Sequence, residues 1–170
     1  FYRFRQRTIS IVKAMRALAV EQGIHQPSWQ RWAELTDRWG NEPVLGWRTE
    51  TSGNKVRAWA AGLDLPTGGE TALFADCEAA FYRPSVPRAV ALLLGAAGVE
   101  FGLMSQQWCC GGPMWETGYV EIAHKMAEHN MIDWRKTGTT RVICLDPHDY
   151  ITIVEHYPTL DENFDEFEIV

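Results

Sequence analysis

Residues 71–77 have the sequence TALFADC, a short apolar run with the length and composition of a buried β-strand. Two more runs of this kind follow it, VEFGLMS at 99–105 and TRVICLD at 140–146. The helix-like segments that alternate with these runs are 85–97, 117–136 and 149–157. This alternation predicts an α/β fold with a small three-stranded parallel, Rossmann-like sheet and right-handed crossover helices.

The residues before the first run are predicted to form a helical segment that precedes the sheet. Apolar residues at helical spacing predict helices at 8–22 and 27–39, and we interpret the Trp residues of the second helix as packing residues. Residues 40–69 contain several Gly and Pro residues and are expected to be largely irregular. We therefore divide the chain into a helical and irregular segment, 1–69, and an α/β domain, 70–170.

Composition and charge exclude several classes of protein. Hydrophobic residues make up 46% of the 170 residues, so the chain can form a core, and its net charge of -6 argues against a nucleic-acid partner. The sequence has no apolar run long enough to span a membrane and no signal peptide. We therefore expect a cytoplasmic protein, either free or peripheral to a membrane complex. Because the chain lacks an initiator Met and ends in the strand-like FEIV, we expect it to be a piece of a longer polypeptide.

The four cysteines are predicted to meet at one edge of the sheet. Cys77 ends the first apolar run, Cys109 and Cys110 follow the second, and Cys144 and Asp146 lie at the end of the third. Ligands of an open parallel sheet bind outside the carboxyl ends of its strands, and thiolates gathered there suit zinc or an iron–sulfur cluster. A vicinal pair chelates one tetrahedral ion poorly but can bind different irons of one cluster, which favours iron–sulfur.

The motif WCCGGP (108–113) and the spacing of the cysteines resemble the cysteine-rich CCG domain of heterodisulfide reductase catalytic subunits and related iron–sulfur proteins. The family pattern is a Cys, a CCG motif and a C-P-x-C motif, with two long gaps of similar length. Here 31 residues separate Cys77 from Cys109, and 33 separate Cys110 from Cys144. The lead-in GNKVRAWAAGLDLP and the basic first helix resemble segments that follow a ferredoxin-type domain in such proteins.

This resemblance implies an iron–sulfur electron-transfer oxidoreductase of the heterodisulfide reductase type, with a 4Fe-4S cluster of cubane or noncubane form. It also implies action on a disulfide or thiol substrate, or relay of electrons to a partner subunit. The implied partners are a ferredoxin-type domain, a second CCG half, and a flavoprotein or membrane cytochrome subunit. The C-terminal FDEFEIV resembles the link into the second half, so this chain would be the first half.

The last ligand motif departs from the family pattern. Where the family has C-P-x-C-Y, this chain has DPHDY, so that Asp146 and Asp149 replace both expected cysteines. An altered iron–sulfur site could be completed by Cys144, Asp146, His148 or Asp149, or the half could hold a smaller or different centre. Alternatively, the half has lost its cluster and is a scaffold that docks partner subunits through its Trp-rich N-terminal segment. Zinc or a free-thiol role are further alternatives.

Several of these residues also have structural interpretations. Cys144 fits a small buried hydrophobic residue, Asp146 fits the N-cap of the last helix, and His148 fits either an exposed loop residue or a titrating ligand. The vicinal cysteines have no common packing explanation, and we interpret them as functional, with the two following glycines allowing close approach to a bulky centre. We predict that Trp108 and Trp115 wall the pocket and exclude water.

Overall fold

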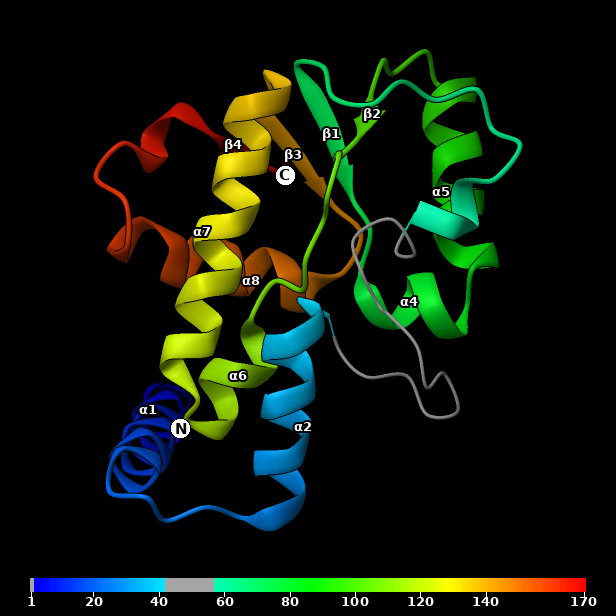
Figure 1. Ribbon diagram of the computed structural model, residues 1–170. Helices are drawn as coiled ribbons and strands as arrows, with labels where there is room; N and C mark the ends of the chain where they lie inside the picture. Colours follow the sequence, from blue (N-terminus) through cyan, green and yellow to red (C-terminus); the bar gives the residue numbers. More distant parts are fainter. Residues whose placement is uncertain (1, 42–56) are drawn as a thin grey trace.

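A four-stranded parallel sheet lies at the centre of the fold, as seen in a computed structural model that describes residues 2–41 and 57–170 (Figure 1). The strands are β1 (Thr71–Phe74), β2 (Gly102–Leu103), β3 (Arg141–Cys144) and β4 (Glu168–Ile169). Their order is β2-β1-β3-β4. The predicted α/β class is confirmed, but the predicted three strands are one too few. The short strand β4 adds to the sheet by pairing with Arg141 and Val142 of β3.

Helices cover both faces of this sheet. The helices of the domain are α4 (Cys77–Tyr82), α5 (Ser85–Ala96), α6 (Gly112–Thr117), α7 (Val120–Thr137) and α8 (Pro147–His156). Short 3-10 turns are η1 (Arg57–Ala60), η2 (Tyr157–Thr159) and η3 (Phe164–Glu166). In Figure 1, α7 and α8 lie to the left of the central strands, and α4 and α5 lie to the right. Both faces of the sheet are therefore removed from solvent around β1, whereas β3 and β4 keep exposed side chains.

Alternate residues of β1 enter two separate cores, because successive side chains of a strand point to opposite faces. Ala72 and Phe74 belong to the larger core, which includes residues of α6, α7 and α8. Leu73 and Ala75 belong to the smaller core, which includes residues of η1, α4 and α5. Burial on both faces explains why the strands are continuous apolar runs in the sequence.

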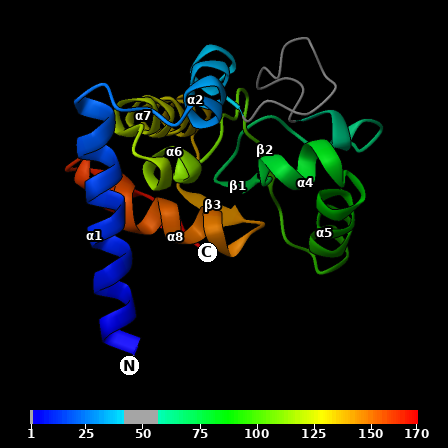
Figure 2. The same cartoon turned by 90° about the horizontal axis from the view of Figure 1, so that it is seen from below.

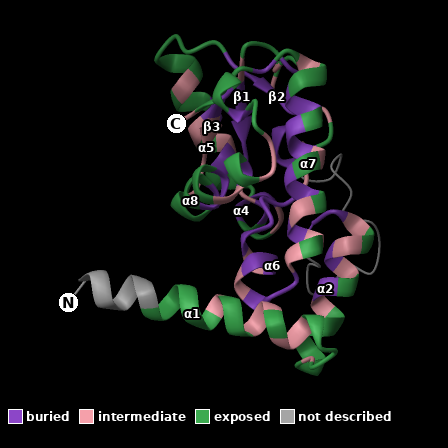
Figure 3. Cartoon of the chain, turned by 90° about the vertical axis from the view of Figure 1, so that its left-hand side faces the viewer, coloured by how far each residue is buried: buried purple, intermediate pink, exposed green. Residues whose placement is uncertain are grey.

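Two helices precede the sheet, α1 (Tyr2–Glu21) and α2 (Pro27–Trp39), as the sequence predicted. Arg16 attaches α1 to α6, since its guanidinium donates to the carbonyl oxygen of Glu116 at 2.7 Å. From Thr8 onward, where its side chains are described, much of α1 is exposed, and the helix extends away from the sheet (Figures 2 and 3). No helix in the described part of the chain has the length and apolarity that a membrane span requires.

The predicted start of the helix at 117–136 is wrong, because this helix is α7 (Val120–Thr137) and Thr117 ends a separate helix, α6. The break lies at Gly118, which has a φ of 95° and is so close to the backbone of Arg16 that a Cβ atom would not fit. The short helices α4 and α6 were not predicted either. Part of the segment predicted to be irregular, residues 42–56, lies outside the described residues.

Two isoleucines of α8 test where the core lies. Ile153 is 0% exposed and packs in the larger core, whereas Ile151 is 50% exposed. We expect Ile153→Val to lower the free energy of unfolding by about 0.5–1.5 kcal/mol, since it removes one buried methylene group. Ile151→Val is the matched control and should change it by less than about 0.5 kcal/mol. Urea titrations of both variants measure the difference, and equal effects would contradict this assignment of the core.

Candidate functional site

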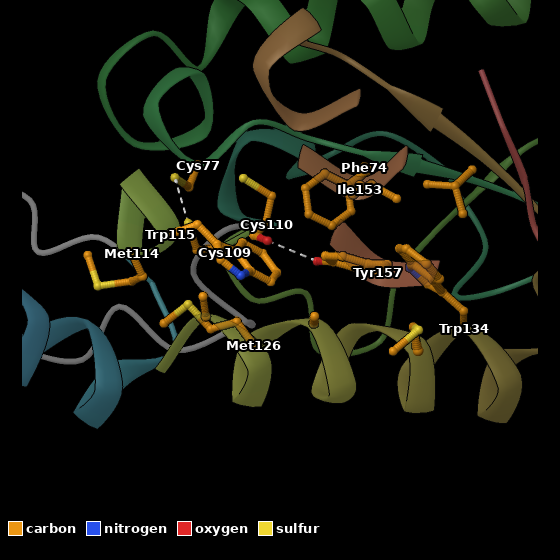
Figure 4. Packing of buried hydrophobic residues seen from close by; sticks show 14 of the residues in the cluster. Phe74, Cys77, Cys109, Cys110, Met114, Trp115, Met126, Trp134, Ile153 and Tyr157 are labelled. Atoms are coloured by element: carbon orange, nitrogen blue, oxygen red, sulfur yellow. Dashed lines mark hydrogen bonds between the residues drawn. The ribbon is translucent and has the colours of Figure 1, made fainter. Parts of the chain in front are cut away.

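Three of the four cysteines lie together beyond the carboxyl ends of β1 and β2. Cys77 is the first residue of α4 rather than the last residue of a strand, and Asp76 caps that helix by accepting from two of its backbone N–H groups. Cys109 and Cys110 lie in the loop between β2 and α6. Figure 4 shows the sulfur atoms of Cys77 and Cys109 facing each other, 4.0 Å apart.

These three thiols form a buried, interacting group. Cys77, Cys109 and Cys110 are 7%, 2% and 2% exposed. Hydrogen bonds from the thiols of Cys110 and Cys77 hold the pKa of Cys109 well below its usual range. The hydrogen bond with Cys109, followed by burial, raises the pKa of both Cys77 and Cys110. The three thiols therefore titrate as one interacting group, in which their mutual hydrogen bonds favour a thiolate.

Backbone amides also act on these sulfur atoms. The backbone N–H of Gly111 lowers the pKa of the Cys109 thiol. The N–H of Gly112 donates to the sulfur of Cys110, with an N–S distance of 3.4 Å. Hydrogen bonds to the charged form of a group favour that form, so both amides stabilise thiolates at the vicinal pair.

Asp149 adds a carboxyl group to this cluster. It lies in the first turn of α8 and is 2% exposed, and its Oδ2 atom has no hydrogen-bond partner among the described residues. One ligand atom each from Cys110, His148 and Asp149 lie within 4.8 Å of one another. Burial raises the pKa of Asp149 well above its usual range, against the opposing effect of the Cys110 hydrogen bond. A buried carboxyl oxygen without a partner is costly, and a cation would relieve that cost.

The other three predicted ligands have different surroundings. Asp146 is the N-cap of α8, where its Oδ1 accepts from the N–H of His148 at 2.7 Å, so the capping interpretation applies. His148 is exposed at the start of the same helix, with Nε2 3.8 Å from a carboxylate oxygen of Glu116. Cys144 ends β3 and is half-buried, and burial, followed by the charge of Asp149, raises its pKa to about 12. Cys144 is not part of the group formed by Cys110, His148 and Asp149.

Two buried side chains hold the main chain of the vicinal cysteines. Asn130 of α7 accepts from the N–H of Trp108 at 2.9 Å, and its Nδ2 donates to the carbonyl oxygen of Cys109 at 3.0 Å. Nδ2 also donates to the hydroxyl of Tyr157 at 3.1 Å. That hydroxyl donates to the carbonyl oxygen of Cys110, again at 3.1 Å. Both Asn130 and Tyr157 are 0% exposed.

Residues from the ends of α2 and β1 hold the same loop. The N–H of Cys109 donates to the carbonyl oxygen of Gly40 at 2.8 Å. Gly40 ends α2 with a φ of 72°, and a Cβ atom there would lie 2.5 Å from the Trp108 ring, so this position requires glycine. The side-chain amide of Gln107 pairs with both backbone groups of Ala75, which ties the loop to the end of β1.

The two glycines after the cysteines are explained by local geometry. Gly111 has a φ of 86° and precedes α6, a conformation that glycine adopts without strain. A Cβ atom on Gly112 would lie 2.6 Å from the ring of His148 and from the hydroxyl of Thr152. The glycine pair therefore permits a tight turn and close packing of α6 on α8, which needs no bulky centre.

The two tryptophans predicted to wall the site stack on histidines. The ring of Trp115, which is buried, lies 4.5 Å from that of His156, and the half-buried Trp108 ring lies 3.7 Å from that of His129. Burial lowers the pKa of both histidines, which favours the neutral imidazole against the indole ring. The exclusion of water by these tryptophans stays a prediction.

Sequence reasoning missed the residues that hold the loop, namely Gly40, Gln107, Asn130 and Tyr157. Asn130 did leave a signal, because it is a polar residue next to Met126, Ala127 and Met131, which form the buried side of α7. A buried amide must find hydrogen-bond partners, so its position suggests a structural role. The other three carry no such mark in the sequence.

Residues 71–153, just under half of the chain, match the family model of the CCG cysteine-rich domain, which confirms the predicted relation. The matched residues include Cys77, Cys109, Cys110, Cys144 and Asp149.

Several curated proteins are similar to this chain. EtfAB:quinone oxidoreductase of Syntrophomonas wolfei is 29% identical over 108 residues, which cover 59% of this chain and 15% of that protein. One component of the dihydromethanophenazine:CoB–CoM heterodisulfide reductase of Methanosarcina acetivorans is 30% identical over 74 residues, 41% of this chain and 18% of that component. Lactate utilization protein A of Macrococcus caseolyticus is 31% identical over 94 residues, 55% of this chain and 37% of that protein. The chain thus spans less than half the length of these relatives. No solved structure gives a significant match.

The buried carboxyl of Asp149 should make the stability of the metal-free chain depend on pH. Its pKa is higher in the folded state than in the unfolded state, where it is about 3.9, so stability falls as the pH rises from that value through the raised pKa. Asp149→Asn removes this loss, and we expect it to stabilise the metal-free chain at pH 7 by about 1 kcal/mol or more, but less at pH 4.

Thermal unfolding at both pH values measures the effect of this substitution. Asp146→Asn is the matched control, since Asn caps a helix about as well as Asp and should change stability little. A stabilisation by Asp149→Asn that is the same at pH 4 and pH 7 would contradict the assignment of a raised pKa.

Proposed function

We propose that this chain is part of an iron–sulfur oxidoreductase, and that Cys77, Cys109, Cys110 and Asp149 hold a cluster of the 4Fe-4S type. The observation that carries this proposal is the group of three buried sulfur atoms beside a buried carboxyl oxygen that lacks a hydrogen-bond partner. When bound, such a cluster supplies reversible one-electron transfer.

The donor set fits an iron–sulfur centre better than it fits zinc. Structural zinc sites usually draw cysteines from short C-x2-C pairs, which the vicinal Cys109 and Cys110 do not form. Iron–sulfur clusters are held by thiolates and tuned by hydrogen bonds to sulfur. The N–H of Gly112 donates to the sulfur of Cys110, and the backbone N–H of Gly111 helps to lower the pKa of Cys109, so both amides favour thiolates at the vicinal pair.

Asp149 occupies the family position of the last cysteine, and its burial next to Cys110 supports its assignment as the fourth ligand. Because burial favours the protonated carboxyl, Asp149 must release its proton when it binds a metal ion. His148 is the alternative for this position, from the solvent side. Asp146 is engaged as a helix cap, and Cys144 ends β3 and is not part of the group formed by Cys110, His148 and Asp149, so we place both outside the ligand set.

The proposed role in electron transfer draws on the names of the relatives, which include a quinone oxidoreductase and a component of a heterodisulfide reductase. By analogy, the parent protein passes electrons between redox domains or subunits, or to a disulfide substrate. The proposed neighbours are a ferredoxin-type domain before residues 1–69, a second CCG half after residues 70–170, and a flavoprotein or membrane cytochrome subunit.

The second candidate function is a cluster-free half that docks partner subunits. The replacement of two family cysteines by aspartates favours it, as does an apolar stripe on α1 formed by Ile11, Met15 and Leu18. Each of these three side chains is more than half exposed, on the side of α1 away from Arg16 and α6. Such a stripe at helical spacing is suited to a partner helix.

Iron analysis separates the two functions. The chain is reconstituted anaerobically with iron and sulfide, and iron, acid-labile sulfide and visible absorbance are measured. We expect the native chain to bind a cluster, and Cys109→Ser to lose most of the iron because it removes a central thiolate ligand.

Cys144→Ser is the matched control and should keep its iron, since Cys144 lies outside the proposed ligand set. A native chain that takes up no iron, or a Cys109→Ser variant that keeps all of it, would favour the docking function. The same assay on the parent protein with its other domains removed assigns the iron to this half.

A further inference from the structure

We propose that Asn130 and Tyr157 are positioning residues that act on the sulfur of Cys109 through the peptide unit joining Cys110 to Gly111. This inference rests on the proposed function, because it concerns thiols that we propose as cluster ligands. It adds two residues, from α7 and η2, that no motif of the family places at the site.

A chain of hydrogen bonds leads from α7 to the peptide unit that joins Cys110 to Gly111. Nδ2 of Asn130 donates to the hydroxyl of Tyr157, and that hydroxyl donates to the carbonyl oxygen of Cys110, each over 3.1 Å. Figure 4 shows this second bond as a dashed line beside the cysteine group. The N–H of Gly111 belongs to the same peptide unit as that carbonyl, and it lowers the pKa of the Cys109 thiol, which we attribute to donation to its sulfur.

The geometry of the peptide bond couples the last two bonds. In a planar trans peptide, the C=O and the N–H point in opposite directions. The hydroxyl that holds the carbonyl of Cys110 toward Tyr157 therefore also fixes the direction of the Gly111 N–H, toward Cys109. Removing the hydroxyl frees this peptide unit to rotate, which changes the bond to sulfur without touching any cysteine.

The donor and acceptor roles in this chain are fixed by its surroundings. Oδ1 of Asn130 accepts from the N–H of Trp108, so the amide must present Nδ2 to Tyr157. The Tyr157 hydroxyl faces a carbonyl oxygen, which only accepts, and burial keeps its pKa above the usual range, so it stays a donor. Both side chains are 0% exposed, so water does not compete for these bonds.

Two effects on the site follow from this arrangement. Hydrogen bonds in a buried chain polarise one another, so donation from Tyr157 strengthens donation by the Gly111 N–H. A stronger N–H donor stabilises negative charge on sulfur, and hydrogen bonds to sulfur help to set the reduction potential of a bound cluster. Tyr157 thus influences the electron affinity of the site from the far side of a peptide bond.

The first test uses the full chain without metal and follows the amide proton of Gly111 by NMR. In Tyr157→Phe we expect this resonance to move upfield and its hydrogen exchange to become faster, because its bond to sulfur weakens. Tyr119→Phe is the matched control, since it also removes a bonded hydroxyl, one that faces Nδ1 of His25 at 3.4 Å. An unchanged Gly111 resonance in Tyr157→Phe would overturn the proposal.

A second measurement keeps every side chain in place, so it remains decisive if Tyr157→Phe fails to fold. Incorporation of 3-fluorotyrosine makes the hydroxyl of Tyr157 a stronger donor, and the Gly111 resonance should then move downfield. A combination with Tyr119→Phe removes the hydroxyl that faces His25, so that its fluorination does not contribute to the shift. A resonance that moves upfield, or does not move, would contradict the proposed polarity of the chain.

The reconstituted chain provides the third readout and separates this inference from the proposed function. Tyr157→Phe should keep its iron stoichiometry and shift the midpoint potential to a more negative value, whereas Tyr119→Phe should leave the potential unchanged. An unshifted potential in an iron-loaded Tyr157→Phe variant would overturn the inference while the proposed function stands. If the native chain binds no iron, the proposed function fails, and the Gly111 resonance still decides the role of Tyr157.

Discussion

The site depends on the parallel pairing of β1 with β3, which sets Phe74 opposite Cys144 in register. Because the strands run in the same direction, their carboxyl ends meet at one edge, and the loops that follow them converge there. Burial of β1 from both faces makes this register costly to change, since a slip of one residue would exchange the contents of the two cores. The pairing of β1 with β2 brings Cys109 to Cys77 in the same way, and the pairing with β3 adds Asp149 from α8.

The parts of the fold that could be predicted are those that leave a periodic pattern. The three longer apolar runs and α1, α2, α5, α7 and α8 did so, and the gathering of cysteines followed from parallel-sheet geometry. The strand β4 lies within the strand-like FEIV, but its two residues do not indicate that it joins this sheet, and α4 and α6 have six residues each. These short helices depend on single residues, the cap Asp76 and the turn at Gly118, rather than on helical spacing.

The residues of the candidate site also fall into two groups. Some belong to a sequence motif, and others come together only in the folded structure. Cys77, Cys109 and Cys110 could be predicted because their spacing is characteristic of a family. Asn130 and Tyr157 could not, because they approach the loop from α7 and η2 only once the core has formed. Their hydrogen bonds are long-range in sequence, and no local preference of the chain specifies them.

The contact between Gly40 and the loop of Cys109 and Cys110 enlarges the smallest segment of the chain that can hold the site together. The family profile begins at residue 71, yet the N–H of Cys109 has its acceptor at the end of α2. A graft of residues 71–153 into another protein would leave that N–H without its partner and uncover one side of Trp108. A segment transferred to another protein must therefore include α2, which supports the cysteine loop structurally and is more than a linker.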